Sequence, residues 1–142
     1  MKKRNYISVL LVEDEEFLLE IIAQFLVAQG PEYLVYKATN GMEAMKWLER
    51  NQPDILITGL IMPQMDGLEL VRNFVALYPQ TPVIMMSGSI KGDSILQAYE
   101  LGICKFLQKP FTWVEFFNSV RFALGAAKSN TLHIFPLPLE DQ

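Results

Sequence analysis

The chain has little cysteine and no excess of basic residues, and each shortage excludes a class of protein. Its single cysteine, Cys104, can form neither an internal disulfide nor a cysteine-based zinc cluster, and it suggests a reducing compartment. The 12 lysines and arginines are outnumbered by 16 aspartates and glutamates, so the net charge is −4. A protein that binds nucleic acid through a basic face needs the opposite balance, and we expect no nucleic-acid partner.

Long hydrophobic runs are also missing. The apolar run Ile7–Val12, behind the basic residues at positions 2–4, ends at once in four acidic residues. It is shorter than the about 7–15 apolar residues of a secretion signal. The longest apolar region, Phe17–Ala28, is interrupted by a glutamate and a glutamine, and it falls short of the about 20 residues of a membrane span. We therefore expect a cytoplasmic protein without a membrane partner.

What the chain does contain is a regular alternation of short apolar runs and segments with helical periodicity. Its 142 residues, of which 51% are hydrophobic, suffice for one domain with a substantial core. Most of the runs are continuously apolar, which is typical of strands covered on both faces of a parallel sheet. The expected strands are Ile7–Val12, Tyr33–Ala38, Ile55–Thr58, Pro82–Met86 and Lys105–Leu107.

The segments between these runs carry the signals of helix ends. Gly30 and Pro31 end a first amphipathic helix, and the other four helices begin at residues whose side-chain oxygens accept the first free N–H groups. These capping residues are Asn40 with Glu43, Asp66 with Glu69, Asp93 or Ser94, and Thr112 with Glu115. The order of elements predicts an α/β fold: a (βα)5 doubly wound parallel sheet with the flavodoxin-like strand order 2-1-3-4-5.

The last residues differ in character from the rest of the chain. We expect residues 5–127 to form the domain and residues 128–142 to form an extended or disordered tail, because Pro136 and Pro138 block a helix there. The one histidine of the chain, His133, lies in this tail, and we expect it to have no chemical role.

Four strands of the predicted sheet end next to residues with metal or phosphate chemistry. In this architecture ligands bind beyond the carboxyl ends of the strands, near the point where the strand order reverses. Glu13 and Asp14 follow the first strand, Gly59 the third, Ser87 the fourth and Lys109 the fifth. Adjacent carboxylates suit Mg²⁺, and a hydroxyl and a lysine suit phosphoryl oxygens. Each residue alone is common in turns, and their joint placement is what indicates a phosphoryl site.

From Ile7 to about Gly125 the sequence resembles the receiver domains of bacterial two-component response regulators. The most specific motifs are M-P-x-M-D-G at Met62–Gly67 and K-P-F at Lys109–Phe111. The segments that carry the resemblance are SVLLVEDEEFL (Ser8–Leu18), PDILITGLIMPQMDGLEL (Pro53–Leu70), PVIMMSGS (Pro82–Ser89) and FLQKPF (Phe106–Phe111). The resemblance implies a part in two-component, or phosphorelay, signal transduction.

The resemblance also implies roles for the residues at the strand ends. It implies that Glu13 and Asp14 hold Mg²⁺, with the backbone carbonyl of Ile61 as a weaker ligand. Ser87 and Lys109 match the residues that contact the phosphoryl group.

A conformational switch and a contact face follow from the same resemblance. Ser87 and Phe106 match the hydroxyl and aromatic positions of the switch, and the bond before Pro110 is often cis in the family. Family members use the fourth helix, fifth strand and fifth helix for dimers and targets, and here the fifth helix is more apolar than one buried stripe requires. The expected interface residues are Ile95, Tyr99, Phe106, Trp113 and Phe117. The expected partners are a histidine kinase or a downstream target, with a homodimer as a further expectation.

One position departs from the family pattern. The phosphate-accepting aspartate of the family lies four residues before the proline of M-P-x-M-D-G, and counting back from Pro63 gives Gly59. Glycine cannot form an acyl phosphate, and its presence removes one carboxylate from the metal site, so we expect Mg²⁺ to bind weakly. Thr58 should point to the other face of the strand, and Asp66 should cap a helix, so we expect no replacement nucleophile.

These observations favour a stand-alone protein-interaction module over an enzyme. We expect a degenerate receiver, or pseudo-receiver, that works without phosphorylation. One alternative is an ordinary phosphoryl-accepting regulator whose aspartate has been lost by mutation, and another reading takes Gly59 as a turn glycine needed for close backbone approach. A flavodoxin-like cofactor binder is a remote alternative, because four acidic residues at positions 13–16 would repel a phosphate.

Overall fold

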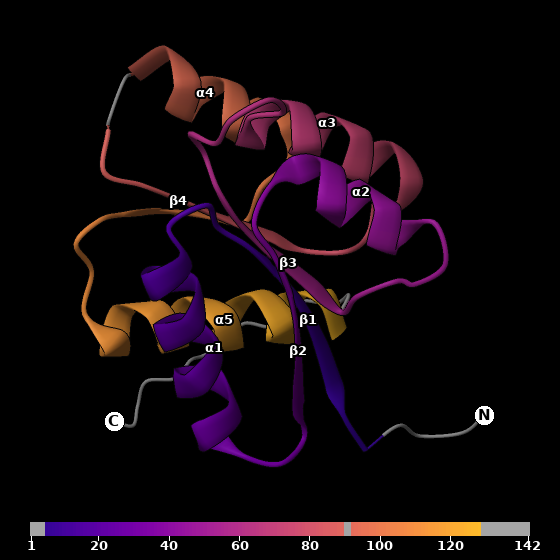
Figure 1. Cartoon of the computed structure of the whole chain (residues 1–142), viewed down its shortest axis with the longest axis vertical. Coiled ribbons are helices and arrows are strands. Elements are labelled where there is room, and N and C mark those ends of the chain that lie inside the picture. Colours follow the sequence, from indigo (N-terminus) through magenta and orange to yellow (C-terminus); the bar gives the residue numbers. More distant parts are fainter. Residues whose placement is uncertain (1–4, 90–91, 129–142) are drawn as a thin grey trace.

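The computed structural model describes residues 5–89 and 92–128, with side chains as far as residue 125 (Figure 1). A five-stranded parallel sheet with the order β2-β1-β3-β4-β5 forms its middle layer. The strands are β1 (Ile7–Val12), β2 (Tyr33–Ala38), β3 (Ile55–Gly59), β4 (Val83–Ser87) and β5 (Lys105–Gln108). The helices are α1 (Glu16–Gln29), α2 (Gly41–Leu48), α3 (Gly67–Leu77), α4 (Gly92–Leu101) and α5 (Trp113–Lys128). The predicted fold class and strand order are confirmed.

The helices cover both faces of the sheet. Figure 1 shows α1 and α5 on one face and α2, α3 and α4 on the other. Successive side chains of each strand point alternately to the two faces, so every strand contributes to two apolar clusters. Val9 and Leu11 of β1, for example, pack with α1 and α5, whereas Leu10 and Val12 pack with the other three helices. None of the helices that the structure describes is long and apolar enough to cross a membrane.

Differences from the predicted boundaries concentrate at the carboxyl ends of the strands. β3, β4 and β5 each continue one residue further than expected, through Gly59, Ser87 and Gln108. These residues lack an apolar side chain, so the hydrophobic pattern did not include them, although the backbone pairing continues through them. β4 begins at Val83 rather than Pro82. The additional residues of β3, β4 and β5 lie at the carboxyl edge of the sheet, next to the expected site.

Helix starts agree closely with the capping signals. Asn40 accepts a hydrogen bond from the Glu43 N–H at 2.8 Å, and Asp66 accepts one from the Glu69 N–H at 2.9 Å. At the start of α5, the Thr112 hydroxyl accepts from the Glu115 N–H, and the Glu115 carboxylate accepts from the Thr112 N–H, both at 3.0 Å.

Two other helix boundaries differ slightly from expectation. α4 begins at Gly92, so Asp93 and Ser94, expected as alternative capping residues, lie within its first turn instead. α5 continues to Lys128, one residue beyond the expected domain end. The remainder of the expected tail, including His133, lies outside the described residues.

Aromatic side chains join α5 to α1. Phe25 of α1 stacks on Trp113 with ring centroids 4.5 Å apart, and it meets Phe117 edge-on at 5.9 Å. These two residues, expected at an interface, therefore have partners inside the domain. Among the side chains of α5 that the structure describes, Val114 and Phe122 are the most exposed apolar ones, and Trp113 remains 39% exposed.

Candidate functional site

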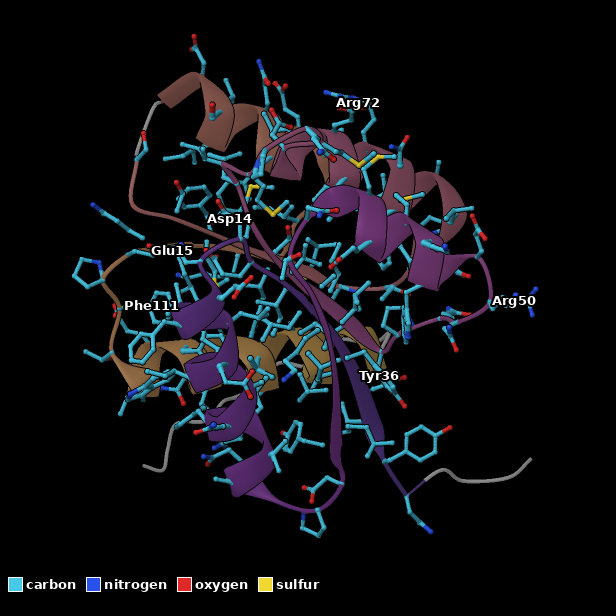
Figure 2. All side chains as sticks on the ribbon, in the orientation of Figure 1. Asp14, Glu15, Tyr36, Arg50, Arg72 and Phe111 are labelled. Atoms are coloured by element: carbon cyan, nitrogen blue, oxygen red, sulfur yellow. The ribbon has the colours of Figure 1, made fainter. Side chains whose placement is uncertain are left out.

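An open pocket of about 260 Å³ lies at the carboxyl ends of β1, β3, β4 and β5. Figure 2 shows Asp14 and Glu15 in the loop between β1 and α1, between the two helical layers. The pocket is lined by Glu13, Asp14, Glu15, Leu60, Ile61, Met86, Ser87, Gly88, Ser89 and Lys109. The structure thus brings the expected acidic pair, hydroxyl and lysine to one edge of the sheet, as the alternation of strands and helices predicts.

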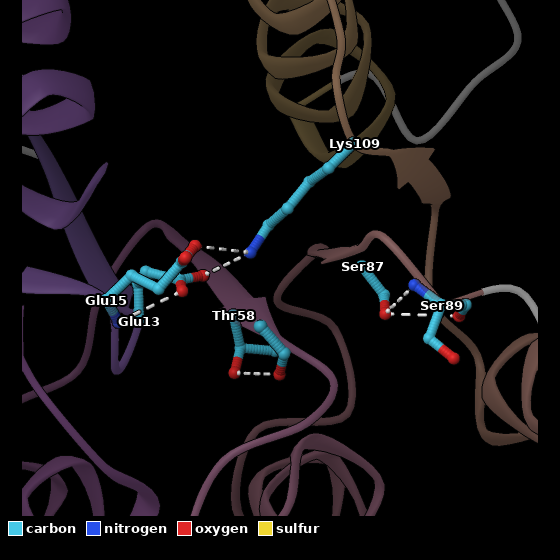
Figure 3. Close-up of polar contacts among 7 residues, drawn as sticks. Glu13, Glu15, Thr58, Ser87, Ser89 and Lys109 are labelled. Atoms are coloured by element: carbon cyan, nitrogen blue, oxygen red, sulfur yellow. Dashed lines mark hydrogen bonds and ion pairs between the residues drawn. The ribbon is translucent and has the colours of Figure 1, made fainter. Parts of the chain in front are cut away.

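An ion pair between Glu13 and Lys109 dominates the pocket (Figure 3). The Lys109 ammonium group lies 3.1 Å from Glu13 Oε1 and 3.6 Å from Glu15 Oε1. The second oxygen of Glu13 accepts a hydrogen bond from the Glu15 N–H at 3.2 Å. Both carboxylate oxygens of Glu13 are therefore engaged by groups of this chain.

Glu13 is almost completely buried, with 1% of its surface exposed. Burial raises the pKa of Glu13 above its usual 4.5, because a charge is poorly solvated there. The neighbouring Lys109 charge and the two hydrogen bonds act in the opposite direction and lower the pKa, but burial has the larger effect. Lys109 thus offsets only part of the cost of burying the Glu13 charge, and the pair differs in this from an ion pair on the solvated surface.

Gly59 lies directly against this carboxylate. A Cβ atom added at Gly59 would lie 3.0 Å from Glu13 Oε1, which is tighter than an ordinary contact. The Glu13 carboxylate therefore lies next to the position from which the resemblance expects an aspartate side chain to extend. Because the close atom is the end of a flexible side chain, a larger residue at position 59 needs only a small movement of Glu13.

The neighbouring oxygen-bearing side chains do not replace the missing carboxylate. Thr58 is fully buried, and its hydroxyl donates to the Gly59 carbonyl at 2.9 Å. The Asp66 carboxylate accepts a hydrogen bond from the Glu69 N–H at the start of α3. Neither residue lines the pocket.

Ser87 is held within its own loop. Its hydroxyl accepts a hydrogen bond from the Ser89 N–H at 3.0 Å and donates to the Ser89 carbonyl at 3.2 Å. Figure 3 shows the Lys109 side chain extending toward Glu13 and Glu15 and away from Ser87. The two residues expected to contact a phosphoryl group thus lie at the same pocket but point to different partners.

Sequence reasoning did not identify Glu15 and Ser89 as pocket residues. A third acidic residue directly after Glu13 and Asp14 was the available signal for Glu15. Ser89 could have been found from the S-x-S spacing, because a serine hydroxyl often bonds to the backbone two residues later.

The pocket residues in this arrangement do not fit a bound Mg²⁺ ion. Glu13 already contacts an ammonium group and an N–H, and Gly59 supplies no carboxylate. Among the residues that the structure describes, no three His, Cys, Asp or Glu side chains gather closely enough to hold a metal ion. The side chains of Asp14 and Ile61 are exposed at the rim.

The expected switch and contact residues lie beyond the pocket, on α4 and β5. Phe106 is half-buried against the cluster of α2, α3 and α4, and its N–H donates to the Tyr99 hydroxyl at 3.0 Å. Tyr99 is 44% exposed, its neighbour Leu96 is 59% exposed, and Ile95 is half-buried. The bond between Lys109 and Pro110 is cis, as the resemblance implied.

Comparisons with known proteins place this geometry in a family. Residues 9–121 match the model of the response regulator receiver domain. Over 113 residues the chain is 35% identical to a protein-glutamate methylesterase/protein-glutamine glutaminase from Treponema pallidum (strain Nichols), covering 78% of the chain and 28% of that protein. Over 127 residues it is 31% identical to YesN, an uncharacterized transcriptional regulatory protein from Bacillus subtilis (strain 168), covering 89% of the chain and 34% of that protein. The chain thus spans about a third or less of these relatives.

Solved structures share the fold over nearly their whole length. A CheY-like receiver domain protein from Methanospirillum hungatei JF-1 superposes with a TM-score of 0.84 at 21% identity, covering 89% of this chain and 99% of that one. The signal receiver domain of an HD domain-containing protein from Pseudomonas fluorescens Pf-5 gives a TM-score of 0.81 at 29% identity, covering 87% and 98%. With the family model matched from β1 into α5, and with the acidic pair, the serine and the lysine gathered at one sheet edge, this chain belongs to the response regulator receiver domain family.

Proposed function

We propose that this receiver domain acts through protein contacts and accepts no phosphoryl group at residue 59. In this proposal the chain is a degenerate receiver and catalyses no reaction of its own. Receiver domains of two-component signalling interact with histidine kinases and effector domains. The part that we infer for this chain is the contact, without the phosphoryl transfer.

The observation that carries the proposal is the contact between Gly59 and Glu13. Residue 59 ends β3 at the pocket and has no side chain that could form an acyl phosphate. The Glu13 carboxylate lies beside it, with Oε1 3.0 Å from the position of an added Cβ. Glu13 is itself buried and paired with Lys109, which makes it a poor nucleophile toward an incoming phosphoryl donor.

Intact mass measurement after incubation with acetyl phosphate and Mg²⁺ tests this proposal. We expect the native protein to keep its mass. A gain of one phosphoryl group that survives acid and is removed by base would overturn the proposal.

Two variants extend the same measurement. Gly59→Asp introduces a carboxylate beside Glu13, while Gly88→Asp introduces one in the same pocket, where an added Cβ makes an ordinary 3.8 Å contact with Lys109. Phosphorylation of Gly59→Asp alone would favour the second candidate function, an ordinary regulator that lost its aspartate by mutation. One observation favours this second candidate function: the pocket still contains the other residues of the family site, Glu13, Asp14, Ser87 and Lys109.

Beryllofluoride with Mg²⁺, which mimics a phosphoryl group bonded to an acceptor carboxylate, provides a second readout. A ligand shifts a conformational equilibrium only through its different affinities for the two states, and here the acceptor carboxylate is missing. We expect the NMR spectrum of the native protein to stay nearly unchanged and that of Gly59→Asp to shift at Ser87, Phe106 and Lys109. Large saturable shifts at these residues in the native protein would contradict the proposal.

We place the protein partner on the surface formed by Ile95, Leu96, Tyr99 and Phe106, called the α4–β5 face here. Leu96 and Tyr99 leave much of their apolar surface in contact with water, and the resemblance implies that partners bind there. Sedimentation equilibrium identifies the occupant. If a second copy binds there, the apparent mass of the native protein rises with concentration, and Leu96→Glu abolishes the rise. Phe17→Glu, which changes an exposed residue of α1, is the control and should keep the rise. A constant monomer mass of the native protein assigns the face to a different protein.

A further inference from the structure

The pocket already contains a positive charge, because the Lys109 ammonium group lies between the carboxylates of Glu13 and Glu15. We propose that Lys109 is a built-in counter-ion that replaces the divalent cation of the family site, so that the pocket keeps one arrangement without metal. The inference deepens the proposed function by addressing how the same site is regulated. It makes a claim about metal only, so it can fail while the proposal about phosphorylation stands.

The first step of the argument is the charge requirement of Glu13. The Glu13 side chain is 1% exposed, and a buried carboxylate without a partner is strongly unfavourable. Lys109 meets the requirement with an N–O distance of 3.1 Å, while its own side chain stays 23% exposed. The chain itself therefore supplies a positive charge at the site.

The second step is the cost of inserting Mg²⁺ into this arrangement. The ion would have to displace Lys109 from Glu13 Oε1, or displace the Glu15 N–H from Oε2. Mg²⁺ gives up its water reluctantly and needs anionic oxygens to offset that loss. Gly59 supplies none, so the gain from Asp14 and Glu13 does not compensate for the broken contacts.

The third step concerns the role of Gly59. A side chain at this position would press on Glu13 Oε1, because an added Cβ would lie 3.0 Å away. Its absence lets Glu13 lie against β3 and meet Lys109 directly. The glycine and the ion pair are thus two parts of one arrangement, and removing Lys109 should expose a latent cation site.

NMR titration of the full chain with MgCl₂ tests the inference, with amide shifts at Asp14, Gly59 and Leu60 as the readout. We expect no saturable shift in the native protein up to about 20 mM Mg²⁺, and saturable shifts in Lys109→Met. The apparent affinity should be at least about tenfold higher in the variant. Lys105→Met is the matched control, because it removes an exposed lysine of β5, four residues before Lys109, and should behave as the native protein. Additions of NaCl at equal ionic strength remove the contribution of screening.

A second variant keeps the test decisive if Lys109→Met is poorly folded. Lys109→Gln retains a side chain that can donate a hydrogen bond to Glu13 but carries no charge, and it should gain Mg²⁺ binding in the same way. The double variant Glu13→Gln/Lys109→Gln should lose it again. Saturable binding in the native protein with an affinity close to that of the variants would overturn the inference, and so would the absence of binding in both lysine variants.

Discussion

The apolar layers of the domain and the polar pocket at its edge each contain a fully buried side chain, but different interactions hold the two side chains in place. Phe116 lies fully buried among apolar side chains, and its contribution comes from non-directional burial. Glu13 is equally buried, yet one of its oxygens is bound by Lys109 and the other by the Glu15 N–H. The comparison shows that this chain buries a carboxylate where each oxygen has its own partner.

The largest expected effect is on the apolar side of the comparison. Phe116→Ala removes a fully buried ring that also stacks on Phe111 at 5.6 Å, and it should lower the free energy of unfolding by about 3–5 kcal/mol. Urea denaturation measures this loss. Phe122→Ala, on the same helix but 60% exposed, should change stability by less than about 0.5 kcal/mol. Equal losses for the two variants would contradict the assignment of the buried face of α5.

Breaking the pocket's ion pair should have the next largest effect. Lys109→Met leaves Glu13 buried without its counter-ion, and we expect a loss of about 2–3 kcal/mol, below the value for a fully buried pair because Lys109 is partly exposed. Thermal or urea unfolding in the presence of EDTA measures it. The exposed Lys105→Met serves again as control, and a similar loss in that variant would show that net charge, not the pair, is responsible.

The pocket also predicts a pH dependence. Because the pKa of Glu13 is raised in the folded state above its usual 4.5, the folded protein binds more protons than the unfolded chain over that interval. The stabilising contribution of Glu13 is therefore complete below pH 4.5 and is lost as the pH rises through the folded-state pKa, with a slope of at most about 1.4 kcal/mol per pH unit. The free energy of unfolding of the native protein minus that of Glu13→Gln should fall as the pH rises. A rise of this value with pH would contradict the raised pKa.

The smallest effect is expected for an exposed polar contact. Asp66 caps α3 through a 2.9 Å hydrogen bond from the Glu69 N–H, and Asp66→Ala should lower stability by about 1 kcal/mol. Chemical denaturation checks this value. A loss as large as that of Lys109→Met would mean that burial adds little to the importance of polar contacts in this chain.

The sequence predicted the parts of the fold that depend on local patterns. Apolar runs located β1 and β2 to the residue, and the pairs Asn40–Glu43 and Thr112–Glu115 located two helix starts. The prediction stopped one residue short where strands end in Gly59 and Ser87, because pairing of the backbone continues without an apolar side chain. Strand order then brought the site residues together, as the topology required.

Contacts that depend on side-chain conformation were harder to predict. The pairing of Lys109 with one member of the acidic pair follows from the missing carboxylate at residue 59, but the extra contact to Glu15 depends on the shape of the loop. Similarly, Phe117 lies on a helix that is apolar all round, and composition cannot distinguish a contact with Phe25 from an exposed position.

The hydrogen bond between Tyr99 and Phe106 bears on how the sheet ends. β5 is the last strand of an open sheet, and an unpaired N–H at such an edge can pair with a strand of another chain. The Phe106 N–H donates a hydrogen bond to the Tyr99 hydroxyl at 3.0 Å, so a side chain from α4 provides the acceptor that a sixth strand would otherwise provide at this point. Tyr99 thereby protects the edge from adventitious strand pairing while α4 stays in place.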